Sequence, residues 1–331
     1  MNSRFPYKLL NKEELRTSIN NLSLNQTPFL FIIDYLANHG YIIKADELDE
    51  QFVKFKTSFS YSKFTTTNLK LTTWNTAPLT LDEYKLKFDY VQQQIQKGNS
   101  FLTNLTQPTA IQTNLSLSKL YDTGNAKYKL WFNNQFTVFS PETFIQINDG
   151  KIAAFPMKGT IEASILNARE LILKDPKEQA EHATIVDLIR NDLSLVAENV
   201  EVKSYRFIEK INTNRCDLLQ VSSEISGELP TDYQSKLGDI LFALLPAGSI
   251  CGAPKIKTLQ IIEESEGYKR GFYTGVFGWF DGKCLDSAVM IRFIEQQDDK
   301  MIFKSGGGIT SKSELEKEYQ ELIQKVYVPI Y

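Results

Sequence analysis

The feature that most constrains the fold is a series of closely spaced strand-like segments near the C-terminus. Residues 271–280 and 283–295 flank the dipeptide Asp281-Gly282, and a Gln-Gln-Asp-Asp turn then leads into a further segment at 301–304. Asp-Gly between two apolar segments is a strong signal for a tight hairpin turn. The pattern predicts an antiparallel meander in which residues 283–295 form one strand.

A second β-rich stretch lies earlier in the chain. Residues 130–139 and 143–158 have the composition of strands, and an Asn-Asp-Gly turn at 148–150 interrupts the second of them. Residues 178–192 have the apolar spacing of a helix. Because strands come in runs with helices between the runs, the order predicts an α+β fold rather than alternating βαβ units.

Two capping boxes mark predicted helix starts. Thr80 can accept a hydrogen bond from an early backbone N–H while the Glu83 side chain reaches back to the Thr80 N–H. Apolar residues then recur at helical spacing as far as Gly98, which is placed to end the helix. A similar box at 313–316 predicts the start of a final amphipathic helix.

The N-terminal quarter of the chain differs from the rest. Residues before 79 are rich in Thr, Ser, Asn and Lys, have one apolar stretch at 28–35, and contain no obvious catalytic constellation. We therefore predict a short N-terminal segment, residues 1–78, that packs on a main domain of residues 79–331.

Composition excludes several classes of protein. The net charge is -3, and no basic patch suggests nucleic acid as a ligand. The longest apolar runs, such as 29–33 and 240–245, are too short to span a bilayer. The N-terminus lacks the apolar core of a signal peptide, so we expect a cytoplasmic protein without a membrane partner.

Cysteine and histidine usage limits which bridges, metal sites and catalytic bases this chain could contain. Three cysteines without C-x-x-C spacing argue against a disulfide framework and against a zinc site. His39 and His182 are the only histidines, so a mechanism with a histidine base would depend on one of these two.

Lys158 is the first candidate for a catalytic residue. It follows an apolar strand that ends at Pro156 and precedes Gly159. Loss of hydration at such a strand end would lower the pKa of the amine and make it available as a nucleophile. Glu142 lies near the same end of the predicted hairpin and could act as an acid. On local sequence alone, a solvated turn lysine and a surface ion pair are the commoner arrangements.

Three glutamates are candidates for holding a metal ion. Glu318 and Glu321 are three residues apart on the last predicted helix, so their carboxylates lie close together and repel unless a positive charge lies between them. Glu181, on an earlier helix, could complete a set of oxygen ligands for Mg²⁺. The alternative is an ordinary solvated acidic face.

Other segments are suited to anions. Residues 248–255 form a Gly/Ser loop that enters a helix, where backbone amides and Lys255 would face a carboxylate. Gly306-Gly307-Gly308 could end a strand and offer a nest of backbone N–H groups. Arg292 is a charge within an apolar strand, and a substrate carboxylate would be a suitable partner. The Walker A order is missing, which disfavours a nucleotide phosphate site.

Taken together and in this order, these motifs resemble the chorismate-utilising enzymes. That family includes anthranilate synthase component I, aminodeoxychorismate synthase component I, and the isochorismate and salicylate synthases. The resemblance extends from about residue 79 to the C-terminus. The motifs are 98–106 (GNSFLTNLT), 140–142 (SPE), 156–160 (PMKGT), 185–192 (IVDLIRND), 248–255 (GSICGAPK), 270–275 (RGFYTG), 305–309 (SGGGI) and 318–321 (EYQE).

The resemblance implies a fold and a branch of the family. The fold is a two-layer antiparallel β-sandwich core flanked by helices. Aminodeoxychorismate synthases carry Pro-Ile-Lys-Gly-Thr where anthranilate synthases carry Pro-Ile-Ala-Gly-Thr, and Lys158 places this chain with the first group. The alternatives are anthranilate synthase component I and a catalytically inactive scaffold relative.

The resemblance also implies roles for individual residues. Mg²⁺ held by Glu181, Glu318 and Glu321 would bind the ring carboxylate of chorismate. Glu142 would protonate the departing 4-hydroxyl while Lys158 attacks C2, and ammonia would then enter at C4 and expel the lysine. The remaining residues expected to contact substrate are Thr160, Lys255, Tyr273, Arg292, Gly306, Gly307 and Gly308.

Two further expectations concern a partner and a departure from the family pattern. The family's ammonia usually comes from a glutamine amidotransferase subunit, and no amidotransferase-like cysteine motif exists in this chain, so such a subunit is expected as a partner. A separate lyase would complete 4-aminobenzoate for folate synthesis. Gln220 stands where relatives often carry a histidine. It can form hydrogen bonds there but cannot transfer protons near neutral pH.

Overall fold

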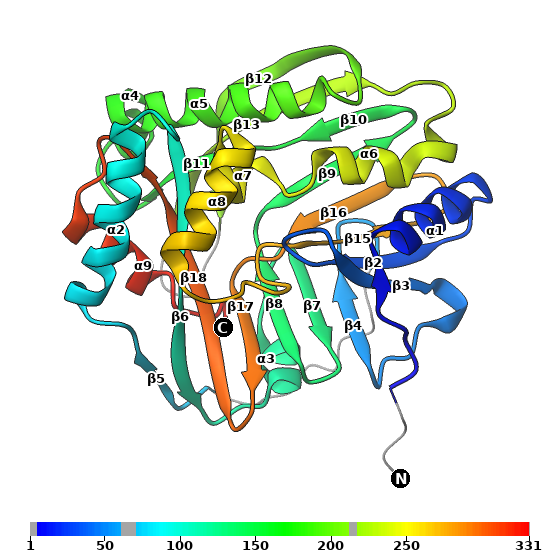
Figure 1. The fold of residues 1–331 in the computed structure, drawn as a ribbon, viewed down its shortest axis with the longest axis horizontal. Coiled ribbons are helices and arrows are strands. Elements are labelled where there is room, and N and C mark those ends of the chain that lie inside the picture. The colour runs from blue at the N-terminus through cyan, green and yellow to red at the C-terminus, as the bar shows by residue number, and fades with distance from the viewer. Residues whose placement is uncertain (1–4, 61–70, 212–216, 331) are drawn as a thin grey trace.

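The computed structural model of the protein describes residues 5–60, 71–211 and 217–330 (Figure 1). Two antiparallel sheets form its centre, and helices lie outside them. The predicted α+β class and the sandwich architecture are confirmed.

Among the described residues the larger sheet has ten strands, nine of which follow one another across it while β12 (Glu198–Ile211) pairs with β13. In spatial order the nine are β1 (Leu10–Asn11), β3 (His39–Lys44), β2 (Phe29–Ile33), β15 (Val276–Phe280), β16 (Leu285–Val289), β9 (Thr143–Asn148), β10 (Lys151–Ala154), β13 (Leu218–Glu228) and β11 (Met157–Glu162).

In the part of the chain that the structure describes, the smaller sheet has eight strands. Seven of them lie in one path, and β5 (Trp74–Ala77) pairs with β6. In spatial order the seven are β14 (Gly252–Ala253), β6 (Leu102–Thr113), β18 (Lys300–Thr310), β17 (Phe293–Gln297), β8 (Phe136–Ser140), β7 (Tyr128–Phe132) and β4 (Val53–Lys56).

Helices cover the outer faces of both sheets. The α-helices are α1 (Lys12–Leu24), α2 (Leu81–Gln96), α3 (Leu117–Thr123), α4 (Ala168–Lys174), α5 (Pro176–Leu193), α6 (Leu237–Leu244), α7 (Gly248–Cys251), α8 (Lys255–Glu266) and α9 (Leu315–Gln324), and two short 3-10 helices are η1 (Ala45–Glu47) and η2 (Tyr233–Lys236). Figure 1 shows α2, α8 and α9 beside β6 and β18, with α1 and α6 on the opposite side of the molecule.

The core between the sheets explains why some strands are apolar throughout. In β2, Leu30 and Ile32 point into the layer between the two sheets, where they meet residues such as Phe277 and Phe293. Phe29 and Phe31 point to the other face of the sheet, into the core covered by α1, α5 and α6. The sequence of a strand that is buried on both faces is a continuous run of apolar residues rather than an alternating pattern.

One predicted strand is divided between the two sheets. Residues 283–295 were expected to be continuous, but β16 belongs to the larger sheet and β17 to the smaller one. The chain changes sheet at Met290–Arg292, where Arg292 has φ +52, and this left-handed backbone ends the strand ladder. Residues 288–294 are apolar across the break except for Arg292, so the sequence pattern did not show it.

The glycine run was also placed incorrectly. Gly306, Gly307 and Gly308 lie inside β18 and pair with residues of β6, and the strand continues to Thr310. They therefore do not form an N–H nest beyond a strand end. At Gly306 a side chain would collide with the backbone of β6, since a Cβ there would lie 2.5 Å from the Leu105 carbonyl oxygen.

The two predicted capping boxes had different outcomes. The box at Thr80 and Glu83 is present in full, and Gly98 follows α2 with φ +75. At the C-terminal helix no side-chain cap forms, because α9 starts one residue later than the box requires, with Glu314 at the N-cap. Ser313 instead donates a hydrogen bond to the Glu318 carboxylate at 2.7 Å.

Residues before 79 contribute to both sheets. β2 lies between β3 and β15 in the larger sheet, and β4 pairs with β7 in the smaller one. In the part of the chain that the structure describes, no helix is long and apolar enough to cross a membrane.

Candidate active site

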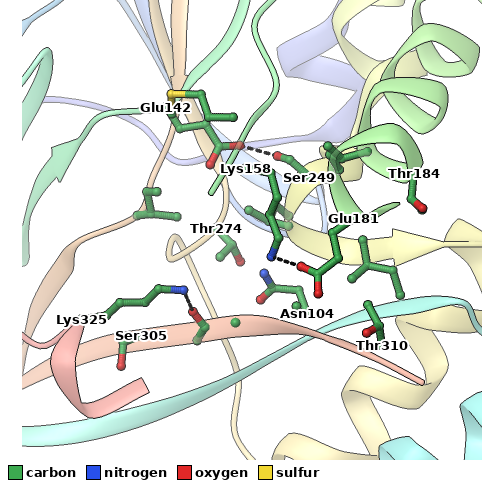
Figure 2. Close-up of a pocket in the computed structure, with 18 of the residues that line it drawn as sticks. Asn104, Glu142, Lys158, Glu181, Thr184, Ser249, Thr274, Ser305, Thr310 and Lys325 are labelled. Atoms are coloured by element: carbon green, nitrogen blue, oxygen red, sulfur yellow. Dashed lines mark hydrogen bonds and ion pairs between the residues drawn. The ribbon is translucent and has the colours of Figure 1, made fainter. Parts of the chain in front are cut away.

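A cavity of about 300 Å³ opens beside the strands where the two sheets and α5 meet (Figure 2). Its walls come from β6, β11, β18, α5, α7, and the segments around Tyr273, Arg292 and Lys325. The residues that line it are far apart in the sequence. The fold therefore brings several of the predicted site residues together.

Lys158 lies at the start of β11, on the side of the cavity toward α5. Its Nζ is 2.8 Å from Glu181 Oε2, and Figure 2 shows the two side chains pointing toward each other. Burial alone would lower the pKa of the Lys158 amine, but the carboxylates of Glu181, Glu321 and Glu178 outweigh it and raise that pKa. The expected lowering of the Lys158 pKa is therefore wrong for this arrangement, in which the amine is held as an ammonium.

Glu142 immediately precedes β9 and lines the same cavity as Lys158. Ser249, from α7, donates a hydrogen bond to Glu142 Oε1 at 2.5 Å (Figure 2). Burial raises the pKa of the Glu142 carboxyl, although Ser249, Lys325 and Arg292 act in the opposite direction. A carboxyl with a raised pKa keeps its proton to higher pH and can donate it to a substrate.

The three predicted metal ligands approach one another from two helices. Glu181 comes from α5, and Glu318 and Glu321 come from α9. A methyl group at Gly307 would lie 3.5 Å from Glu318 Oε2 and 3.5 Å from Glu321 Oε1, so this glycine leaves room for both carboxylates. Among the described residues, no three Asp, Glu, His or Cys side chains are arranged as a metal-binding group.

Lysines accompany all three glutamates. Lys158 contacts Glu181 at 2.8 Å, Lys177 lies 3.8 Å from Glu318, and Lys325 lies 2.6 Å from Glu321. Glu181 Oε1 is nevertheless buried without a hydrogen-bond partner. The oxygen donors of these glutamates are of the type that a hard cation such as Mg²⁺ prefers. In this arrangement of the described residues the three are not drawn together as a ligand group, and the positive charge beside them comes from lysine side chains.

The cavity also carries groups suited to an anion. Arg292 lies over the ring of Tyr327, 5.1 Å from its centroid, and has no carboxylate partner in the described ranges. Tyr273 is buried beside it, and burial raises the pKa of its hydroxyl. At Gly308 an added methyl group would lie 2.9 Å from the Leu102 side chain and 3.9 Å from Lys158 Nζ, so this glycine leaves room beside the lysine.

Sequence reasoning missed several polar residues that line this cavity, among them Lys325 and Ser249. Lys325 donates a hydrogen bond to the Gly306 carbonyl oxygen at 2.9 Å and pairs with Glu321 one helical turn earlier. The i,i+4 spacing from Glu321 was the available signal for Lys325. Ser249 lay inside a predicted anion-binding loop, but its contact with Glu142 depends on the fold.

Two predicted substrate residues are not brought to the cavity. Lys255 turns away to pair with Asp192 at 3.1 Å and to donate to the Leu244 carbonyl oxygen at 3.2 Å. Thr160 is exposed and lines a separate open groove beside α4. Gln220 opposes Thr160 in the pairing of β11 with β13, and it is not among the described residues that line the cavity.

Comparison with known proteins agrees with this geometry. A family model described as chorismate binding enzyme matches residues 17–330. A protein of Haemophilus influenzae named "uncharacterized PabA-like protein" is 48% identical over 311 residues, which cover 94% of this chain and 95% of that protein. Aminodeoxychorismate synthase component 1 of Bacillus subtilis is 32% identical over 267 residues, which cover 76% of this chain and 55% of that protein.

The chain is also similar to proteins named for a different activity and to solved structures. Proteins named anthranilate synthase component 1 match at a comparable level of identity. The crystal structure of anthranilate synthase component I from Streptococcus pneumoniae aligns with a TM-score of 0.68 and 21% identity, covering 98% of this chain and 81% of that one. This structural likeness establishes the fold.

Proposed function

The chain belongs to the chorismate binding enzyme family, and on that basis we propose that it is an aminodeoxychorismate synthase component I. Its reaction would convert chorismate and ammonia to 4-amino-4-deoxychorismate. The observation that carries this choice is the position of Lys158, whose amine reaches into the same cavity as the Glu142 carboxyl. An alanine at this position would favour the anthranilate-forming branch instead.

The proposed chemistry uses Glu142 as the acid and Lys158 as the nucleophile. Glu142 protonates the 4-hydroxyl of chorismate, which leaves as water while the Lys158 nitrogen bonds to C2 and the ring double bonds shift. Ammonia then bonds to C4, the double bonds shift back, and the bond between C2 and the lysine nitrogen breaks. The covalent route divides one difficult substitution into two easier ones.

Lys158 must first lose a proton. The contact with Glu181 at 2.8 Å holds it as an ammonium, which has no free electron pair. Attack on C2 therefore requires that this ion pair separate and that the amine become neutral. Glu181 Oε2 is the carboxylate oxygen that contacts this amine.

Two substrate carboxylates must be offset by positive charge. Glu181, Glu318 and Glu321 would hold Mg²⁺, which supplies charge stabilisation to the ring carboxylate. Arg292 and Tyr273 would hold the enolpyruvyl carboxylate, and the glycine run of β18 would leave room beside it. Lys325 also lines the cavity, where it pairs with Glu321, and it adds a further cation beside the substrate.

We expect Lys325→Met to raise the KM for chorismate by roughly 10- to 100-fold with a smaller change in kcat, because loss of a charge-assisted contact weakens binding. Steady-state kinetics at saturating ammonium would measure both constants. Lys312 lines the same cavity but is exposed, so Lys312→Met is the matched control and should change KM by less than about threefold. An unchanged KM in Lys325→Met would remove Lys325 from the substrate site.

The proposed function includes a partner. A glutamine amidotransferase subunit would supply the ammonia, and a separate lyase would release 4-aminobenzoate for folate synthesis. Adding such a subunit should allow glutamine to replace ammonium salts in the reaction. Failure to use glutamine in its presence would count against the partnership but not against amination itself.

Identification of the product tests the proposal directly. The chain would be incubated with chorismate, ammonium and Mg²⁺, and the products separated and identified by mass. The expected product is 4-amino-4-deoxychorismate, which yields 4-aminobenzoate only after a lyase is added. Fluorescent anthranilate formed without a lyase would reject the proposal in favour of anthranilate synthase component I, and no turnover would favour an inactive scaffold relative.

A further inference from the structure

Lys177 is a second lysine beside the predicted metal ligands. It lies on α5 one turn before Glu181 and lines the cavity. Its Nζ is 3.8 Å from Glu181 Oε1 and also 3.8 Å from Glu318 Oε1. One ammonium group therefore lies between carboxylates that come from two different helices.

These contacts act through charge rather than through hydrogen bonds. A separation of 3.8 Å exceeds hydrogen-bond length, and Glu181 Oε1 has no hydrogen-bond partner. The side chains of Glu181 and Glu318 are only 10% and 5% exposed, so little water screens their repulsion. Lys177 supplies the positive charge at this point.

The Lys177 ammonium can move away from these two carboxylates into solvent. The Lys177 side chain is 40% exposed, whereas both of its carboxylate partners are almost fully buried. A lysine side chain is flexible and strongly hydrated, and this one makes no hydrogen bond that would fix its position within the described ranges. Moving it into solvent would leave two buried carboxylates facing each other.

We propose that Lys177 is an exchangeable counter-cation, which occupies the space between Glu181 and Glu318 and is displaced into solvent when a divalent cation binds there. This inference rests on the proposed metal site. An ammonium and a divalent cation repel each other at such short range, so both cannot remain between the same two carboxylates.

If this exchange occurs, removing Lys177 has two measurable consequences: the affinity for a divalent cation rises and the stability of the cation-free chain falls. Removing the ammonium takes away a competitor, so a divalent cation binds more tightly. It also leaves the Glu318 carboxylate without its lysine and leaves Glu181 with Lys158 alone, so the cation-free chain becomes less stable. A lysine with only a packing role would lower stability without tightening cation binding.

The test compares the wild-type chain with Lys177→Met and Lys174→Met. Lys174 pairs with Glu170 on an exposed surface and is the matched control. Mn²⁺ would be titrated into each chelator-treated protein by calorimetry, and thermal unfolding would be followed in EDTA. Lys177→Met should bind Mn²⁺ roughly 10-fold more tightly and unfold at a lower temperature, while Lys174→Met should match the wild type in both measurements.

Unchanged or weaker Mn²⁺ binding in Lys177→Met would overturn the proposal, and so would the absence of binding in both proteins. Neither measurement uses turnover. Amination of chorismate is assayed separately, so a chain that shows the expected Mn²⁺ behaviour but forms no 4-amino-4-deoxychorismate would refute the proposed function alone.

Discussion

Replacing Lys158 with alanine should reduce the amination of chorismate by at least about 1,000-fold, because the covalent route through C2 is lost. The side chain lines the cavity and is partly exposed within it, and its charge is paired with one carboxylate. Its removal should therefore leave the fold intact. Product formation would be followed by chromatography, and thermal unfolding would establish that the variant is folded.

Intact-mass analysis separates the covalent role from a purely electrostatic one. The wild-type chain incubated with chorismate and Mg²⁺, but without ammonia, should gain the mass of chorismate minus water, and Lys158→Ala should gain nothing. Lys312→Ala removes another lysine from the same cavity and should keep both the adduct and most of the activity. Substantial amination by Lys158→Ala would contradict the nucleophilic role.

The sequence was informative about features that depend on short-range patterns. Thr80 and Glu83 form the expected cap because both partners lie within one helical turn. The α+β class followed from strands in runs, whereas the sandwich was implied by the resemblance, and both are present. The strand break at Arg292 was missed because apolar periodicity does not record which of two sheets a residue joins.

The candidate site was predictable in its residue types more than in its electrostatics. Lys158 and Glu142 do meet in one cavity, as the hairpin register indicated. The direction of the Lys158 pKa was misjudged because it depends on Glu181, which reaches Lys158 only through the packing of α5 against β11. Lys255 carried the right charge, but Asp192 on α5 takes it as a partner away from the cavity.

The second large effect is expected at Glu142. Glu142→Gln should slow amination by about 100- to 1,000-fold, because the amide cannot donate a proton to the departing hydroxyl while its shape and its contact with Ser249 are retained. Burial raises the pKa of Glu142, so its acid form survives to higher pH than an ordinary glutamate. The wild-type rate should therefore fall as pH rises through that raised pKa, since only the protonated carboxyl is the acid.

A pH profile of kcat distinguishes an acid from a residue that only shapes the cavity. The wild-type profile should contain the limb that falls with rising pH, and Glu142→Gln should lack it as well as being slower. Glu178 is a suitable control, since burial also raises the pKa of its carboxyl but it lines the open groove rather than the cavity. Glu178→Gln should keep the falling limb and lose less than about tenfold in rate. A Glu142→Gln variant that keeps the same limb would assign the proton donor to another group, because glutamine has no carboxyl proton to lose.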